Sequence, residues 1–89
     1  MSLLPLGHVY ATPGALALLA EAGIAATELL SRHASGDWGD IPAEDAAENR
    51  RSIEQGFRVM SSYDIDGQRV WLITEADRRS TTLLLPSEY

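Results

Sequence analysis

The pair Asp66-Gly67 constrains the fold of this chain more than any other feature of its sequence. It lies between two stretches, residues 57–65 and 68–74, in which apolar and polar side chains alternate. An Asp-Gly pair in that setting is a strong signal for a two-residue turn between antiparallel strands. The turn fixes the register, so we expect Tyr63 opposite Val70 and Ser62 opposite Trp71.

This register divides the side chains of the hairpin between two faces. One face is expected to be apolar and to carry Phe57, Val59, Tyr63, Val70 and Leu72. The other face carries Met60, Ser62, Trp71 and Ile73, together with a charge pair formed by Asp64 and Arg69. The apolar face requires helices to cover it.

Residues 7–56 supply an additional strand and three helices. The β-branched and aromatic residues of 7–12 predict a strand, and Thr12 and Pro13 have the residue types of a helix start. Residues 13–22 are apolar nearly all round, which predicts a buried helix that ends at Gly23. A second helix is expected at about 26–34, followed by a surface helix from Pro42 to Gly56. The apolar stripe of that third helix is thin: Ala43, Ala46, Ala47, Ile53 and then Phe57.

A last strand is predicted in "TTLLLP", which Pro86 closes. With 89 residues, the chain has room for one core. We therefore expect residues 1–89 to form a single small α+β domain. Its antiparallel sheet has about three to four strands, and about three helices pack mainly on one face.

Negative charge is concentrated in the middle of the chain. The net charge is −6, every one of the seven cations is arginine, and residues 37–56 hold six acids against two arginines. Nucleic acid would be repelled there, because binding depends on cations that neutralise phosphates. A protein partner with a basic or arginine-rich surface would be attracted. A solvated acidic helix without a partner is the alternative interpretation.

Three segments of the chain resemble a known group of proteins. "LGHVYATPGALALL", "LLSRHASGDWGD" and "WLITEADRRSTTLLLPSEY" are similar to a family of small bacterial proteins, described as plasmid-related, from plasmids and integrated elements. The resemblance covers almost the whole chain, and the GDWG and ITEADR…TT-LLP-EY segments are distinctive. It implies a bacterial origin and a mobile-element context, but it supplies no catalytic residues. One departure is Ala26, where similar sequences often have proline.

The sequence offers no specific catalytic or metal-binding motif. His8 and His33 are far apart, and although His33 could bind a cation with Asp37 and Asp40, we expect it to cap a helix C-terminus as a partly positive imidazole. No serine lies on a strand-to-helix elbow, and "TPGA" has too few glycines for a phosphate loop. We therefore expect no catalytic residues, no metal and no cofactor.

Two other functions have partial support. A helix followed by a sheet that bears Arg58, Tyr63, Arg69, Glu75 and Arg78 loosely resembles small microbial ribonucleases and RNA-cleaving toxins. That enzyme alternative is opposed by the acidic charge and by a sheet without histidine. The segment 16–33 also resembles a DNA-binding helix-turn-helix. Its second helix, however, offers only Arg32 as a cation.

Trp38 stands in a turn-like stretch, "SGDWGD", with no apolar run around it. One hypothesis is that the indole folds back and closes one end of the core, with an acceptor for its N–H. The other is that Trp38 is an exposed anchor inside an acidic rim. The turn "TEADRRS" presents the same two options, and the sequence does not say whether the two loops are adjacent. The candidate binding residues are Asp37, Trp38, Asp40, Glu75, Asp77 and Arg78.

These observations favour a non-enzymatic, acidic module that binds a protein partner and modulates a host defence or nucleic-acid-acting protein. The chain has no cysteine, no apolar run of membrane-spanning length, and no basic leader at "MSLLPLG". We therefore expect a cytoplasmic protein that contacts neither membrane nor nucleic acid.

Overall fold

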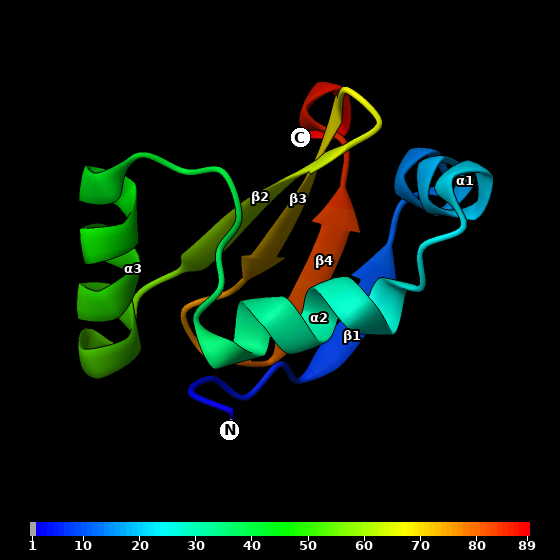
Figure 1. Cartoon of the computed structure of the whole chain (residues 1–89). Helices are drawn as coiled ribbons and strands as arrows, with labels where there is room; N and C mark the ends of the chain where they lie inside the picture. The colour runs from blue at the N-terminus through cyan, green and yellow to red at the C-terminus, as the bar shows by residue number, and fades with distance from the viewer. Residues whose placement is uncertain (1) are drawn as a thin grey trace.

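The fold is described from a computed structural model, in which residues 2–89 are placed (Figure 1). Four strands, three α-helices and a short 3-10 helix follow one another along the chain. In order they are β1 (His8–Ala11), α1 (Pro13–Ala22), α2 (Ala26–Ser35), α3 (Ala43–Gln55), β2 (Val59–Ile65), β3 (Gln68–Thr74), β4 (Ser80–Leu84) and η1 (Pro86–Glu88). The predicted α+β class is confirmed.

The four strands form one mixed sheet in the order β1-β4-β3-β2. β2, β3 and β4 pair antiparallel, as the sequence predicts, whereas β1 pairs parallel to β4. The predicted hairpin register is confirmed, because Tyr63 lies opposite Val70 and Ser62 opposite Trp71. The prediction of an antiparallel sheet is therefore wrong for β1 alone. Three helices separate β1 from the β2–β3 hairpin along the chain, and β4 then runs in the same direction as β1.

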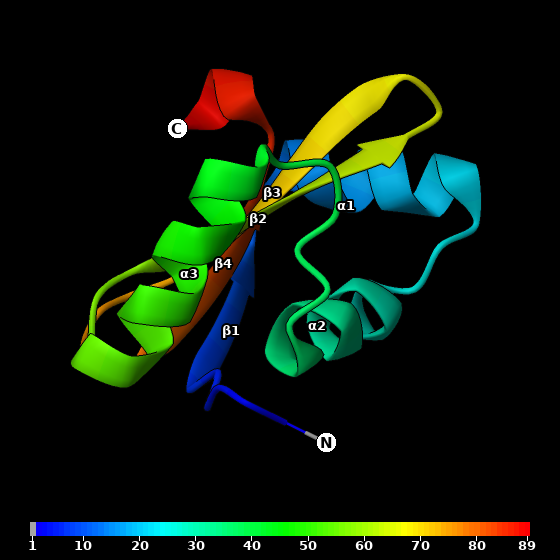
Figure 2. The same cartoon turned by 60° about the vertical axis from the view of Figure 1, so that its left-hand side comes forward.

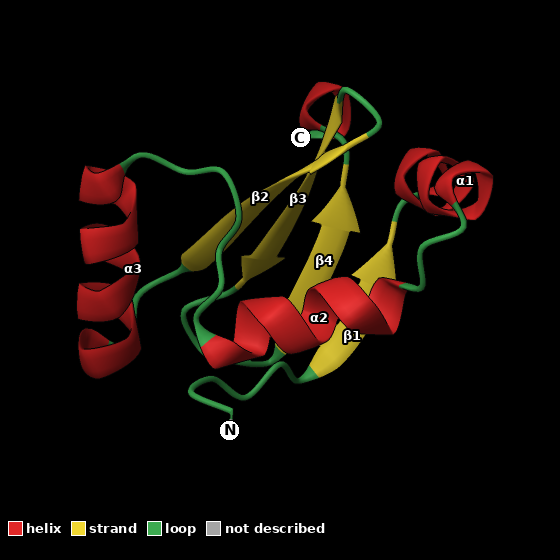
Figure 3. Cartoon of the chain, in the orientation of Figure 1, coloured by secondary structure: helices red, strands yellow, loops and turns green. Residues whose placement is uncertain are grey.

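Two of the three helices, α1 and α2, cover one face of the sheet and the main core lies beneath them, whereas α3 lies beside the β2 edge (Figures 2 and 3). This core combines α1, α2 and the inward side of β2, β3 and β4. Its buried members are Ala15, Leu18, Leu19, Leu29, Tyr63, Ile65, Val70, Leu72 and Leu83. A smaller cluster of Leu4, Trp38 and Val59 lies between the main core and α3. The opposite face is called the open sheet face below; it carries Met60, Ser62, Trp71, Ile73, Thr82 and Leu84, of which Ser62, Ile73 and Leu84 are themselves buried.

The start of α1 matches its sequence signals. The Thr12 side chain accepts a hydrogen bond from the backbone N–H of Ala15, and Gly23 ends the helix in the left-handed conformation. The carboxylate of Glu88 adds a second cap, because it accepts bonds from the Thr12 hydroxyl and from the Gly14 N–H. These bonds, the first one above all, lower the pKa of Glu88.

Two expectations about side chains are wrong. α1 is not buried all round, since Leu16 is 52% exposed and only one side of the helix contacts the core. Phe57 is also 52% exposed, because it follows the left-handed Gly56 and leaves the apolar face. The predicted position of Asp64 opposite Arg69 is confirmed, although the guanidinium of Arg69 forms its ion pair with Asp40, at 3.6 Å.

Within residues 2–89, no helix taken singly has the length and apolar character needed to cross a membrane. α1 and α2 meet those criteria only as a pair that is bent by 104°, and only by length and composition.

Candidate functional site

The "SGDWGD" stretch closes the outer edge of β2. Gly39 forms a parallel bridge with Ser62: the Ser62 N–H donates to the Trp38 carbonyl, and the Asp40 N–H donates to the Ser62 carbonyl. A Cβ at Gly39 would collide with the Ser62 carbonyl oxygen and with the Tyr63 ring, and Gly39 has a φ of +74°. Glycine is therefore required here by a close approach of two backbones.

Trp38 is buried, which agrees with the core-plug hypothesis. Its side chain is only 6% exposed and packs with Leu4 and Val59, with Ile41 and Ile53 at the margin of the cluster. The expected acceptor for the indole is not found: the Trp38 Nε1–H is buried without a hydrogen-bond partner within residues 2–89. Little indole surface is left for a partner protein.

Asp37 organises the C-terminal end of α2. Its carboxylate accepts a 2.7 Å bond from Arg32 Nε, and its carbonyl accepts one of 2.6 Å from the Tyr63 hydroxyl. The Arg32 guanidinium lies over the Tyr63 ring, 4.6 Å from its centroid. The Arg32 hydrogen bond lowers the pKa of Asp37, and the same bond raises the pKa of Arg32. The side chains of Arg32 and Asp37 are half-exposed and are bonded to each other.

Asp40 and Glu75 lie at the rim of the open sheet face. Each carboxylate pairs with an arginine of that face: Asp40 with Arg69 at 3.6 Å, and Glu75 with Arg58 at 3.4 Å. Arg58 also donates to the Tyr89 hydroxyl at 2.8 Å, and this bond is the main reason why its pKa is raised. Tyr89 in turn contacts Trp71 edge to face at 5.8 Å.

Asp77 and Arg78 shape the β3–β4 turn. The Asp77 carboxylate accepts the Arg79 N–H, and Arg78 has a φ of +61°. The Arg78 guanidinium donates to the carbonyls of Ser52, Phe57 and Glu75 at 2.9, 2.7 and 3.1 Å. Arg78 therefore ties the end of α3 to this turn. No hydrogen bond or ion pair within residues 2–89 joins the 74–80 turn to the 35–40 loop.

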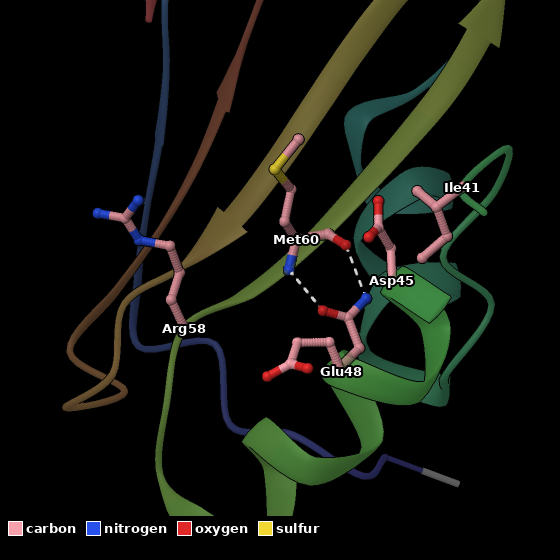
Figure 4. Close-up of a pocket in the computed structure, with 6 residues that line it drawn as sticks. Ile41, Asp45, Glu48, Arg58 and Met60 are labelled. Atoms are coloured by element: carbon pink, nitrogen blue, oxygen red, sulfur yellow. Dashed lines mark hydrogen bonds between the residues drawn. The ribbon is translucent and has the colours of Figure 1, made fainter. Parts of the chain in front are cut away.

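A hollow of about 210 Å³ lies between α3 and the open sheet face (Figure 4). We call it the acidic hollow; it is lined by Ile41, Asp45, Glu48, Asn49, Arg58 and Met60. Ile41 and Met60 supply its apolar surface, while Asp45 and Glu48 stand one helical turn apart on the α3 side. Asp45 takes part in no ion pair within residues 2–89, and Glu48 forms an ion pair there only with Arg51, at 2.7 Å.

Asn49 holds α3 in the position that forms this hollow. Its amide donates to the Met60 carbonyl at 2.7 Å and accepts from the Met60 N–H at 3.1 Å, as the dashed lines in Figure 4 mark. The side chain thus replaces a neighbouring strand at the edge of β2. The buried residues of α3 are the polar Asn49 and Ser52, and Ala46 and Ile53 beside them are partly buried against the Trp38 cluster.

His33 is not a helix cap, and the expectation of a partly positive imidazole there is wrong. The side chain is fully buried between α2 and the sheet, where its Nδ1 meets Ser61 and its Nε2 meets Thr74 at 2.9 Å. Burial lowers the pKa of His33 to about 4, so the ring is neutral near pH 7.

The hydrogen bonds around His33 form a chain with one direction. Thr81 donates to the Leu6 carbonyl, so Thr74 must donate to Thr81, and His33 Nε2–H must donate to Thr74. Nδ1 is then the acceptor of the Ser61 hydroxyl. Ser61 and His33 are each 0% exposed, so this pair supports the core and is closed to a substrate. No cluster of three or more His, Asp or Glu suited to a metal ion is present in residues 2–89.

The sequence pointed to the acidic segment but not to the hollow. Asp45 and Glu48 were counted among the acids of 37–56, while Ile41, Asn49 and Met60 carried no signal of their own. Their proximity depends on the Asn49–Met60 contact between α3 and β2. This contact is not predictable from the sequence of a helix with a thin apolar stripe.

No protein-family model matches this chain, and no curated protein or solved structure matches it either.

Proposed function

We propose that this chain is a non-enzymatic, acidic protein-interaction module whose acidic hollow receives a basic side chain of a protein partner. The observation that carries the proposal is the combination, in one hollow, of apolar surface from Ile41 and Met60 with the carboxylates of Asp45 and Glu48. An arginine or lysine has the matching form, since its aliphatic stem covers apolar surface while its head seeks a carboxylate.

The charge distribution supports a basic protein partner over nucleic acid. Residues 37–56, which include α3, hold six acids against two arginines. Phosphates brought to this surface would meet carboxylates, whereas a basic partner would be steered toward it. A role in a bacterial mobile element follows from the sequence resemblance, and action on a host defence or nucleic-acid-acting protein rests on that context together with the acidic charge. Both, with a cytoplasmic location, are part of the same proposal.

The side chains required by the ribonuclease alternative are engaged elsewhere. Tyr63 is 1% exposed, and burial raises its pKa to about 12, which removes it as an acid–base group near neutral pH. The guanidinium of Arg78 is bonded to three backbone carbonyls, and Arg58 to Glu75 and Tyr89.

The helix-turn-helix alternative is supported only by the angle between α1 and α2. α1 and α2 are bent by 104°, within the range of that motif. The exposed side of α2, however, offers Glu28 and a single cation, Arg32, which is already paired with Asp37. A recognition helix needs several free donors toward phosphates and bases.

The proposal is tested with a fluorescein-labelled arginine-rich peptide and a matched peptide in which citrulline replaces each arginine. Citrulline keeps the shape of the side chain and removes its charge. At physiological salt we expect the arginine peptide to bind and to shift the backbone NMR signals of Ile41, Asp45 and Met60. Equal binding of both peptides, shifts confined to another surface, or cleavage of added RNA by the pure protein would contradict the proposal.

A further inference from the structure

The two edges of the sheet differ in how far the rest of the chain bonds to their outward backbone groups. At the β2 edge, the outward backbone groups of Met60 are bonded to the Asn49 amide, and those of Ser62 to Trp38 and Asp40. At the β1 edge, no comparable cover exists within residues 2–89. Exposed, unpaired strand edges are templates for pairing with another strand, and proteins normally block them.

The parallel pairing with β4 determines which groups of β1 remain free. The N–H groups of His8 and Thr12 donate to the carbonyls of Arg79 and Leu83, so His8, Tyr10 and Thr12 point their backbone toward β4. Val9 and Ala11 therefore direct their N–H and C=O groups outward. No hydrogen bond to these groups is found in the described part of the chain.

The free edge is also largely apolar, and His8 is the only basic side chain of β1. Residues 1–20 contain no Asp, Glu, Lys or Arg. Val9 is 45% and Tyr10 57% exposed, whereas the neighbouring β4 is largely buried. Four of the six exposed large hydrophobic side chains of residues 2–89 lie in this segment: Leu3, Val9, Tyr10 and Leu16. Apart from His8, β1 has no basic or acidic side chain with which to attract a charged peptide.

We propose that β1 pairs antiparallel with β1 of a second copy of this chain, which would join two sheets into one across a two-fold axis. With Tyr10 opposite its own copy, Val9 lies opposite Ala11 of the second copy, and each such pair exchanges both of its hydrogen bonds. All outward groups of both strands are then satisfied. The two exposed Tyr10 rings meet in a non-hydrogen-bonded pair, where side chains approach most closely.

The charge distribution permits this pairing despite the net charge of −6. α3 contacts β2, and β1 and β2 are at opposite edges of the sheet (Figure 1). Three gaps of about 4.8 Å between strands separate those edges, so the acidic helices of two copies would be roughly 30 Å apart or more. That distance exceeds the screening length of about 8 Å at physiological salt.

Sedimentation equilibrium of the full chain, followed up to millimolar concentration, tests this inference with two charge variants. Tyr10→Glu places two like charges on the axis, while Phe57→Glu is the matched control, an equally exposed aromatic residue remote from β1. We expect the wild type and Phe57→Glu to approach twice 9.7 kDa, and Tyr10→Glu to weaken dimerisation at least about tenfold. A monomeric wild type, or equal effects of the two variants, would overturn the proposal.

Hydrogen exchange of the wild type provides a readout that needs no variant. Because their N–H groups point outward, Val9 and Ala11 should exchange fast in dilute protein and slowly in concentrated protein, whereas Met60 should not change. Concentration-independent exchange at Val9 and Ala11 would count against the β1 pairing even if the protein were a dimer. This test is independent of the acidic hollow, so either proposal can fail alone.

Discussion

Replacing Trp38 by alanine should remove a large part of the stability of this domain. The indole is 6% exposed and fills the cluster formed with Leu4 and Val59. Truncation of a buried aromatic side chain to alanine costs about 3–5 kcal/mol, through lost burial and the cavity left behind. A chain of this size has a free energy of unfolding of only about 5–13 kcal/mol, so Trp38→Ala should be partly unfolded at 37 °C or melt far below the wild type.

Trp38→Phe separates the contribution of the ring from that of the unpaired N–H. Phenylalanine keeps most of the aromatic volume and removes the buried Nε1–H, whose lack of a partner costs about 1–3 kcal/mol. The lost volume lowers the free energy of unfolding, whereas removal of the unpaired N–H raises it. We therefore expect Trp38→Phe to be destabilised by less than half as much as Trp38→Ala.

The assay is urea unfolding followed by far-UV circular dichroism, because Trp38 itself would dominate a fluorescence signal. Phe57→Ala is the control, since that ring is 52% exposed and its removal should change the free energy of unfolding by about 0.5 kcal/mol or less. If Trp38→Ala unfolded within about 1 kcal/mol of the wild type, the core-plug argument would fail. The alternative hypothesis, that Trp38 is an exposed binding anchor, would then be favoured.

Three further predictions concern the polar interior and the β2 edge. The pKa of buried His33 is about 4 against an ordinary 6.5, so the unfolded chain takes up a proton at this residue at a higher pH than the folded chain. The free energy of unfolding should therefore fall by about 3 kcal/mol between pH 6.5 and pH 4. In urea titrations at different pH values, His33→Gln should lose this pH dependence and His8→Gln should keep it. Asn49→Ala leaves two backbone groups without partners and should cost about 1–3 kcal/mol, with faster hydrogen exchange at the β2 edge as the measurement; unchanged exchange there would contradict the edge role. Gly39→Ala should destabilise the chain more than Gly67→Ala in thermal melts, because both glycines have positive φ but only Gly39 also faces a collision; equal shifts of the two melting temperatures would refute the close approach.

The parts of the fold that the sequence predicted are those with local causes. Asp66-Gly67 fixed the hairpin register, and Thr12, Pro13 and Gly23 marked the ends of α1, because turn and cap chemistry acts over a few residues. The direction of β1 was not predictable, since a strand of four residues carries no signal for parallel or antiparallel pairing.

The parts that the sequence missed depend on distant partners. His33 was assigned to a helix end, yet its hydrogen-bond partners Ser61 and Thr74 are 28 and 41 residues away. The docking of α3 was predicted only in part: Ala46 and Ile53 of the expected apolar stripe pack against the Trp38 cluster, whereas the contact of Asn49 with β2 had no signal in the sequence. The acidic hollow follows from that docking, so the sequence predicted its charge but not its shape.

The proposed function is tested most directly by the affinity for the arginine-rich peptide in two variants of equal net charge. Asp45→Asn with Glu48→Gln removes both carboxylates of the hollow, while Glu44→Gln with Glu54→Gln removes two exposed acids of α3 that do not line it. A site in the hollow predicts at least about tenfold weaker binding for the first variant and about twofold or less for the second. Equal losses in the two variants would show that the peptide responds to net charge alone, and would contradict the account.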